Sequence, residues 1–233
     1  DLRTAMGSRA PFIYEDLKKS ILSFQLMPGE NVSENNLSEK YGTSRTTIRP
    51  VLKRLEDEVL IRVIPQKGSF VTYLDYDYIE SIIFIRLQVE YEILRRLTGS
   101  MPEEVKQKLQ NFIGEEKYAE CADAETYFAL DSGFHRIVFD ALPFKEVGQR
   151  IEALDASCKR YRLLCHQRLN KTAHDLYAEH FELFQRILSG DTDSVFRFFK
   201  GYLYGDIDAL EKVLGEDWDL YFMERRGTQA QYR

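Results

Sequence analysis

The chain has 233 residues, of which 44% are hydrophobic and 13% aromatic, enough to bury one large core or two modest ones. We expect neither a membrane protein nor a secreted one, because no apolar run is long enough to cross a bilayer and no charged-then-apolar leader is present. The formal net charge is −6, yet residues 1–74 carry 11 basic and 9 acidic side chains, whereas the rest carries 21 and 29. A nucleic-acid partner is therefore expected only for residues 1–74, because the local field steers a protein onto phosphate.

The cysteines indicate a reducing environment. There are three, Cys121, Cys158 and Cys165, and they lack the CxxC spacing of a thiolate metal site. An odd number without a framework pattern predicts reduced thiols that pack as small apolar residues, and with them a cytoplasmic protein.

The N-terminal third predicts short helices separated by clear breaks. Residues 1–9 are polar and patternless, which predicts a disordered or cloning-derived tail. Apolar and charged residues alternate at helical spacing over 12–24, and Pro28-Gly29 then breaks the chain. A second short helix over 34–41 ends at Gly42, which can adopt the left-handed conformation that a helix end requires.

A helix-turn-helix follows from the next residues. Ser44 stands at an N-cap position, where its hydroxyl can accept a hydrogen bond from an amide of the next turn. Apolar residues recur at helical spacing and can pack the two helices together; they are Leu37, Tyr41, Ile48, Leu52 and Leu55. Two short strands, 61–64 and 69–72, flank the turn Pro65-Gln66-Lys67-Gly68 and predict a wing.

The exposed face of the second helix suits a DNA major groove. Arg45, Arg49 and Lys53 are spaced i, i+4, i+8, so they point the same way. Arginine can bind the O6 and N7 atoms of guanine bidentately, and threonine can reach a phosphate or a base edge. The predicted DNA-binding residues are Ser44, Arg45, Thr46, Thr47, Arg49, Lys53, Lys67 and Gly68.

This third of the chain resembles the GntR-type bacterial transcription regulators. The resemblance rests on an ordered series of segments: Ile13-Tyr14-Glu15-Asp16-Leu17, Ile21-Leu22-Ser23, Pro28-Gly29-Glu30, Ser33-Glu34-Asn35-Asn36-Leu37-Ser38, Gly42-Thr43-Ser44-Arg45-Thr46-Thr47-Ile48-Arg49 and Gly68-Ser69-Phe70-Val71. It implies a winged helix-turn-helix over residues 10–74. The chain departs from the family at Val59, where glycine is usual, and at Pro50, where an acidic residue is usual. Proline inside a helix costs about 3 kcal/mol or more, so we expect a bent or loosened recognition helix with altered DNA binding.

Residues 75–77 predict a short linker to an all-helical domain over 78–233. The helical segments are 78–98, 102–119, 124–142, 144–168, 172–188 and 192–214, with breaks at Gly99-Ser100, Pro143, Asn170 and Gly190-Asp191. Short connections between such helices favour an antiparallel bundle. The expected fold class is therefore mostly α: a winged helix-turn-helix followed by an all-α antiparallel helical bundle.

Polar residues interrupt the apolar stripes of this bundle. Asp131 and His135 are i, i+4 on one helix, His180 lies on another, and Tyr202 lies in line with apolar residues of the last. Polar groups on inward stripes are costly unless they are hydrogen-bonded or bound to a ligand.

The segments around these residues resemble the FCD ligand-binding domain of the FadR-like branch of the same regulators. They are Leu130-Asp131-Ser132-Gly133-Phe134-His135, Glu179-His180-Phe181 and Leu188-Ser189-Gly190-Asp191. The resemblance implies a divalent metal on Asp131, His135 and His180, with a small organic acid in the open positions and Tyr202 where a fourth ligand, histidine, is usual. Zinc, nickel or manganese suits such a donor set. The alternative is a metal-free polar pocket in which Asp131 pairs with His135.

Other polar side chains leave two interpretations open. Arg86 and Glu90 are i, i+4 and can form an ion pair within one helix, or Arg86 can grip an effector carboxylate. Tyr202 can hydrogen-bond the effector. His166 is expected at the surface, and Arg162 is a possible anion contact.

Together these features predict a homodimeric, ligand-responsive transcription regulator, most simply a repressor, that binds a short palindromic duplex operator. The competing hypotheses are a helical metalloenzyme that uses the Asp/His site, and a regulator with a degenerate, metal-free pocket. No nucleophile motif or phosphate-binding glycine loop supports the enzyme.

Overall fold

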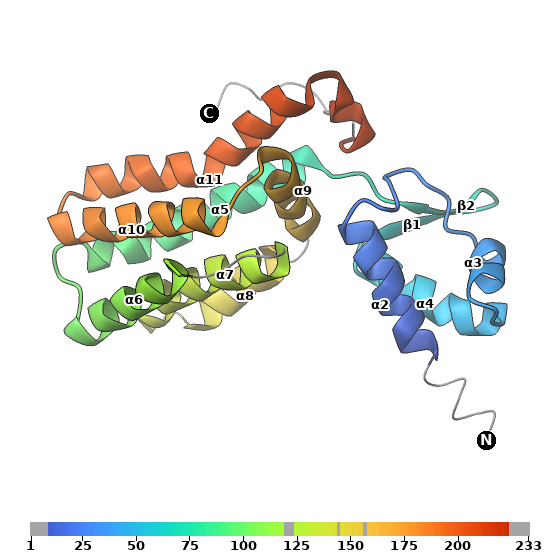
Figure 1. Ribbon diagram of the computed structural model, residues 1–233, viewed down its shortest axis with the longest axis horizontal. Coiled ribbons are helices and arrows are strands. Elements are labelled where there is room, and N and C mark those ends of the chain that lie inside the picture. The colour runs from blue at the N-terminus through green and yellow to red at the C-terminus, as the bar shows by residue number, and fades with distance from the viewer. Residues whose placement is uncertain (1–8, 119–123, 144, 156–157, 224–233) are drawn as a thin grey trace. The chain divides into compact units, whose positions relative to one another are not determined.

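A computed structural model describes residues 9–118, 124–143, 145–155 and 158–223. The described chain is mostly helical and forms two compact units, a winged helix-turn-helix and a helical domain, which confirms the expected fold class (Figure 1). Cys121 lies outside the described residues, while Cys158 and Cys165 are both buried. No described helix is long and apolar enough to cross a membrane.

The first unit contains three helices and a two-stranded antiparallel wing. Its elements are α2 (Arg9–Leu22), α3 (Glu34–Lys40), α4 (Arg45–Asp57), β1 (Ile61–Ile64) and β2 (Gly68–Val71). The strands pair in a register that places Ile61 opposite Val71 and Ile64 opposite Gly68. Ile13, Leu17, Ile48 and Leu55 are almost fully buried in one core, because the apolar stripes of α2 and α4 face each other.

The two helix starts in the helix-turn-helix are capped differently. Ser33 accepts a hydrogen bond from the amide of Asn36 and caps α3. Ser44 has the extended backbone of an N-cap but makes no side-chain cap bond, so that expectation was wrong. Its hydroxyl instead lies 2.7 Å from the Thr46 hydroxyl and 3.0 Å from that of Thr47, because two nearby hydroxyls compete with the amides for it.

The end of α4 forms a Schellman motif at an unusual residue. The Leu60 amide donates to the Leu55 carbonyl and the Val59 amide to the Glu56 carbonyl, both at 2.9 Å. Leu55 and Leu60 are buried on the core side, as the motif requires. Val59 adopts φ 59° at the position where glycine is usual, which is costly for a β-branched side chain.

We expect Val59→Gly to stabilise the protein by about 1 kcal/mol, because relief of about 1–2 kcal/mol of left-handed strain exceeds the added backbone entropy of glycine. Urea unfolding measures the change. Val63→Gly is the matched control: Val63 is also an exposed valine, but it lies in β1, so its replacement should destabilise the wing. A loss of stability with Val59→Gly would contradict the strain argument.

Helix α4 is one helix through Pro50. Pro50 has no amide hydrogen to donate to the carbonyl of Thr46, so the first full turn lacks one ladder bond. That this bends the helix or alters DNA binding stays a prediction.

Residues near the C-terminus join the first unit rather than the helical domain. After η2 (Gly215–Leu220), the Leu74 amide donates to the Tyr221 carbonyl at 2.9 Å, and the Met223 amide donates to the Leu74 carbonyl at 3.0 Å. The Trp218 and Phe222 rings stack with centroids 3.8 Å apart. The compact unit therefore includes the described residues from Glu216 onward. The reason is that these backbone bonds and rings pack beside the expected linker.

The second unit is an all-helical domain. Its helices are α5 (Tyr76–Leu97), α6 (Glu103–Glu116), α7 (Ala124–Asp140), α8 (Lys145–Asp155), α9 (Lys159–Leu169), α10 (Ala173–Ser189) and α11 (Thr192–Leu214). The expected single helix over 144–168 was wrong, since α8 and α9 are separate. No glycine or proline marks that break, so the helical pattern in the sequence runs on. Helix α5 also begins at Tyr76, inside the expected linker.

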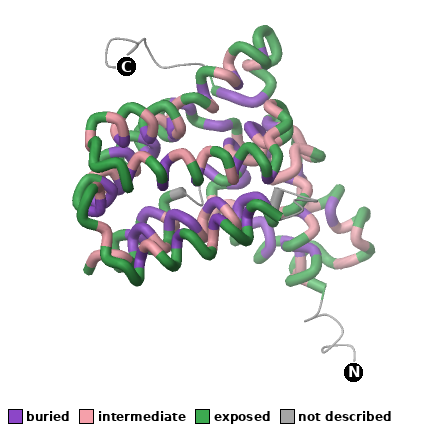
Figure 2. The backbone as a smooth tube through the Cα atoms, turned by 60° about the vertical axis from the view of Figure 1, so that its left-hand side comes forward, coloured by how far each residue is buried: buried purple, intermediate pink, exposed green. Residues whose placement is uncertain are grey.

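Buried positions follow the inward faces of these helices (Figure 2). Helix α10 begins with a capping box between Thr172 and Asp175 and ends at Gly190, whose φ is 82°. It packs against α6, α7 and α11, and this arrangement brings polar residues from four helices to one place.

Candidate metal and effector site and DNA-binding face

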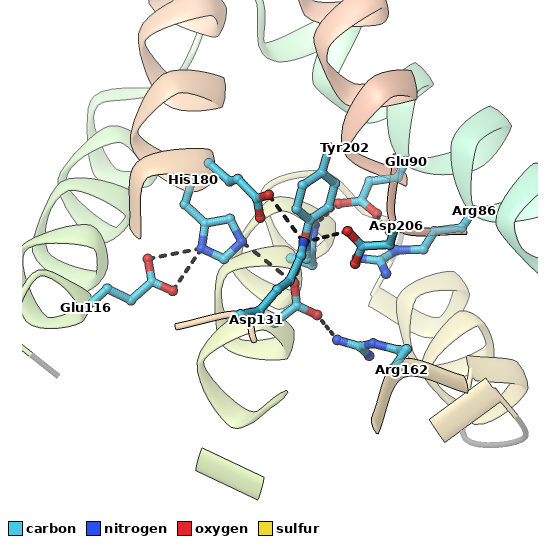
Figure 3. Close-up of polar contacts among 11 residues, drawn as sticks. Arg86, Glu90, Glu116, Asp131, Arg162, His180, Tyr202 and Asp206 are labelled. Atoms are coloured by element: carbon cyan, nitrogen blue, oxygen red, sulfur yellow. Dashed lines mark hydrogen bonds and ion pairs between the residues drawn. The ribbon is translucent and has the colours of Figure 1, made fainter. Parts of the chain in front are cut away.

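A cavity of about 70 Å³ lies among α5, α7, α9 and α11 in the helical domain. Apolar side chains form much of its wall: Ile79, Ile82, Ile83, Phe128 and Leu203. Charged and hydroxyl groups also line it: Arg86, Asp131, Tyr161, Arg162, Lys171, Tyr202 and Asp206. Figure 3 shows five of them, Arg86, Asp131, Arg162, Tyr202 and Asp206, pointing toward one another. A wall of this mixed character suits a small ligand with a charged group.

The three residues expected to bind metal converge beside this cavity. Asp131 and His135 project from successive turns of α7, and His180 projects from α10; all three are buried. The Oδ1 atom of Asp131 lies 3.5 Å from Nε2 of His135 and 3.8 Å from Nε2 of His180. One potential ligand atom from each residue lies within 4.8 Å of the others, so the cluster could hold a metal ion.

Two buried glutamates orient the histidines; sequence reasoning named Glu90 only as a partner of Arg86 and did not name Glu116. Nδ1 of His180 lies 2.8 Å and 3.0 Å from the carboxylate oxygens of Glu116, and Nδ1 of His135 is hydrogen-bonded to Glu90. A carboxylate on Nδ1 directs Nε2 toward a metal and is the usual partner of a ligating histidine. Both glutamates interrupt apolar stripes, Glu116 after Ile113 on α6 and Glu90 on α5. Helical periodicity could therefore have predicted that these two side chains are buried.

Arg162 binds the aspartate of the cluster. Its guanidinium donates to Oδ2 of Asp131, a contact that the sequence could not rank. Burial alone would raise the pKa of Asp131, but Arg162 and His135 together hold it well below its usual range. Asp131 is therefore a carboxylate at neutral pH, as a metal ligand or cation partner must be.

The two histidines have opposite pKa shifts. Burial disfavours the charge on His135, yet the Glu90 carboxylate outweighs it and raises the pKa. Burial dominates at His180 and lowers its pKa. His180 therefore offers a neutral imidazole, and its buried Nε2 has no hydrogen-bond partner among the described residues.

Tyr202 of α11 closes the cluster from the side opposite Arg162. Its hydroxyl donates to Oδ1 of Asp131 and lies 3.1 Å from Nε2 of His135. Burial and the negative charge of Asp131 raise the pKa of Tyr202 well above its usual value, so the side chain is a neutral phenol.

The remaining charged groups at the cavity are paired within the domain. Nε of Arg86 lies 3.1 Å from Glu90, the ion pair that one interpretation expected, and Arg86 also lines the cavity. Lys171 bridges Asp206 at 2.7 Å and Glu179 at 3.3 Å. His166 was expected at the surface, but it lines the cavity, because its ring packs edge-on to Tyr127 at 4.8 Å.

The charge and donor set of this cluster fit a divalent cation. Three cations and five carboxylates surround it, a net charge of −2 in their ordinary ionisation states: Arg86, Arg162, Lys171, Glu90, Glu116, Asp131, Glu179 and Asp206. A buried imidazole nitrogen without a partner is the second sign, because buried polar atoms are almost always satisfied.

The first unit presents the expected cationic face. Arg45, Thr46, Arg49 and Lys53 are all exposed on α4. Arg45 makes no hydrogen bond or ion pair within the described structure, whereas Arg49 donates to Glu34 at 2.8 Å. Lys53 lies 2.9 Å from Asp57. Arg45 is thus the cation of this face that can engage DNA without first leaving an acidic partner.

The wing turn depends on glycine. Gly68 has φ 122°, and a Cβ there would lie 2.8 Å from Nδ2 of Asn31. Lys67 stands exposed beside it, so the turn presents a positive charge at its tip.

Both parts of the chain match family models. Residues 9–71 match "Bacterial regulatory proteins, gntR family" and residues 81–203 match the FCD domain. The "HTH-type transcriptional repressor RspR" of Escherichia coli K12 is 24% identical over 213 residues, which cover 91% of this chain and 93% of that protein. A regulator "in unstable DNA locus" of Streptomyces ambofaciens is 28% identical over 210 residues, covering 90% and 88%.

Solved structures share the fold. "E. coli McbR/YncC" superposes with a TM-score of 0.56 at 17% identity and covers 87% of this chain and 97% of its own. A putative GntR regulator from Rhodococcus sp. RHA1 gives a TM-score of 0.52 at 23% identity, covering 89% and 98%. The two sequence relatives and the Rhodococcus protein are named as transcription regulators and not as enzymes. The chain therefore belongs to the GntR family of bacterial transcription regulators, as a DNA-binding member of the FadR-like branch that carries an FCD domain.

Proposed function

We propose that this regulator is a homodimeric repressor whose FCD domain senses a small carboxylate through a divalent metal on Asp131, His135 and His180. The observation that carries the metal is the partnerless Nε2 of His180, which lies 3.8 Å from Oδ1 of Asp131 in a fully buried cluster. Zinc, nickel and manganese are the candidate ions, because nitrogen and oxygen donors suit all three. When bound, such an ion would offer a Lewis-acid contact to a carboxylate oxygen of the effector.

The side chains around the cavity would select the effector. The guanidinium of Arg86 faces the cavity while Glu90 holds it, so it is oriented to receive a carboxylate with its planar fork. Tyr202 supplies a neutral hydroxyl beside the cluster, suited to a hydrogen bond with the effector. The apolar wall would pack against the carbon skeleton of the acid.

The winged unit would bind a palindromic operator in the bacterial cytoplasm. Arg45, Thr46 and Thr47 at the start of α4, with Ser44 before them, are expected to reach base edges and phosphates, and the wing residues Lys67 and Gly68 to follow the backbone. A palindrome has a twofold axis, which requires two copies of the chain. The effector would act by binding the two arrangements of the dimer with different affinity.

A metal-free pocket is the second candidate, and one observation favours it: Arg162 and Tyr202 already satisfy both oxygens of Asp131. In that case the effector would bind the polar side chains directly.

Metal content separates these candidates. We expect the purified protein to contain about one divalent ion per chain and His180→Ala to lose it, because the substitution removes one of only three donors. His174→Ala is the matched control, since His174 lies exposed on the same helix. Chelator should lower the melting temperature of the parent protein and of His174→Ala but not of His180→Ala. Absence of metal from the parent protein, with no thermal shift on adding zinc, nickel or manganese, would leave the metal-free pocket.

A further inference from the structure

The Tyr202 hydroxyl lies where the donor atoms of the Asp131, His135 and His180 cluster meet. It donates to Oδ1 of Asp131 and lies 3.1 Å from Nε2 of His135, so it engages two of the three donor atoms of the cluster. Its ring is held in place by Phe199, with which it stacks at a centroid distance of 6.1 Å (Figure 3 shows Tyr202 over the cluster).

The separations of these atoms match those of ligands around a single ion. With bonds of about 2.0–2.2 Å, donors on one tetrahedral zinc stand about 3.3–3.6 Å apart. Oδ1 of Asp131 is 3.5 Å from Nε2 of His135 and 3.8 Å from Nε2 of His180, and the Tyr202 oxygen is 3.1 Å from Nε2 of His135. The Tyr202 oxygen is in hydrogen-bond contact with both Asp131 and His135, closer to them than two ligands of one ion would stand, so it occupies space that a cation between these donors needs.

A hydrogen bond to Tyr202 and a bond to a cation are mutually exclusive at His135. The single hydrogen of the Tyr202 hydroxyl goes to Asp131, so Nε2 of His135 donates its own hydrogen to the Tyr202 oxygen, and an Nε2 that carries a hydrogen has no lone pair for a cation.

We propose that Tyr202 is an affinity-setting residue of this site: its hydroxyl competes with a divalent cation for Asp131 and His135, so that the site exchanges its metal instead of retaining it permanently. This rests on the metal site of the proposed function. The competition makes metal binding reversible, so that the fraction of sites that hold an ion follows the concentration of that ion. A cation entering the cluster has to displace the hydroxyl from both donors, and departure of the cation lets the hydroxyl return to them.

Zinc titration against a chromophoric chelator tests this with three full-length variants. Tyr202→Phe removes the competing hydroxyl and keeps the ring, and we expect it to bind Zn²⁺ about tenfold more tightly than the parent protein. Tyr202→His supplies a fourth nitrogen donor, and we expect binding at least about 100-fold tighter. Tyr204→Phe is the control, a half-buried tyrosine two residues along α11 that contacts none of the cluster, and its affinity should equal that of the parent.

Each contrary outcome is distinct. If Tyr202→Phe binds Zn²⁺ more weakly than the parent, Tyr202 is a ligand or a support for the site and the competition proposal is overturned while the metal site stands. Equal affinity of Tyr202→Phe and the parent overturns it in the same way. If the parent and all three variants, each with an unchanged circular-dichroism spectrum, fail to bind Zn²⁺, the metal site itself falls, and binding of DNA by the winged unit is untouched.

Discussion

Replacing Arg45 by alanine should weaken binding to an operator duplex by about 10- to 100-fold, the largest loss expected from any one residue of α4. The physical reason is that a bidentate arginine contact with guanine is worth about 1–3 kcal/mol of discrimination. Among the residues that the structure describes, Arg45 has no hydrogen-bond or ion-pair partner that it would have to leave first. Arg49 and Lys53 should matter less, because each has to leave a carboxylate, Glu34 or Asp57, before it reaches DNA.

The measurement needs two duplexes, one selected by the parent protein from a random library and one scrambled. Loss of Arg45 should affect the selected duplex far more than the scrambled one, since base contacts specify sequence and phosphate contacts do not. The matched control is Arg54→Ala on the same helix, about 180° from Arg45 at about 100° per residue. Its guanidinium lies 3.6 Å from the centroid of the Tyr14 ring, so it is held against the unit instead. Equal losses for Arg45→Ala and Arg54→Ala would show that α4 does not bind through its N-terminal turn.

Replacing Pro50 by alanine should stabilise the winged unit by about 2–3 kcal/mol, because alanine restores an amide donor to the Thr46 carbonyl and removes the ring clash. Pro50 is exposed, so the substitution deletes no core contact. Urea unfolding of the full chain provides the measurement. The same substitution should change affinity for the selected duplex, since Arg45 and Arg49 precede Pro50 in the turn that lacks its hydrogen bond.

Pro65→Ala serves as the control for this prediction. Pro65 opens the wing turn, where Gln66 has φ 62° and the Lys67 amide donates to the Ile64 carbonyl at 3.0 Å. Proline is favoured at the second position of such a turn, so its loss should lower stability slightly. If Pro50→Ala changes neither stability nor DNA affinity, the helix tolerates its proline without strain, and the prediction is wrong.

The sequence by itself predicts the features of this protein that depend on residues close together along the chain. Helical periodicity, the break at Pro28-Gly29 and the turn at Gly68 are local, so the winged helix-turn-helix followed from residues a few positions apart. Asp131 and His135 share one face for the same reason, because i, i+4 residues lie together on any helix. The cysteine spacing likewise predicted thiols that pack as small apolar residues, and Cys158 and Cys165 are both free and buried.

Two predictions from local patterns were wrong, the cap bond of Ser44 and the single helix over 144–168. Ser44 stands at the N-cap position, but its hydroxyl is hydrogen-bonded to the hydroxyls of Thr46 and Thr47 instead of to a backbone amide. The helical pattern over 144–168 has no glycine or proline between Asp155 and Lys159, yet the chain forms two helices there.

Only the tertiary structure decided which residues meet across helices. The contacts of Glu90 with His135, of Glu116 with His180 and of Arg162 with Asp131 span 45, 64 and 31 residues, and no periodicity encodes which stripe faces which. The same holds for the C-terminal segment, whose backbone pairs with Leu74 from the far end of the chain. Amphipathic patterns state that a face is buried, whereas the partner of that face depends on how all the helices pack at once.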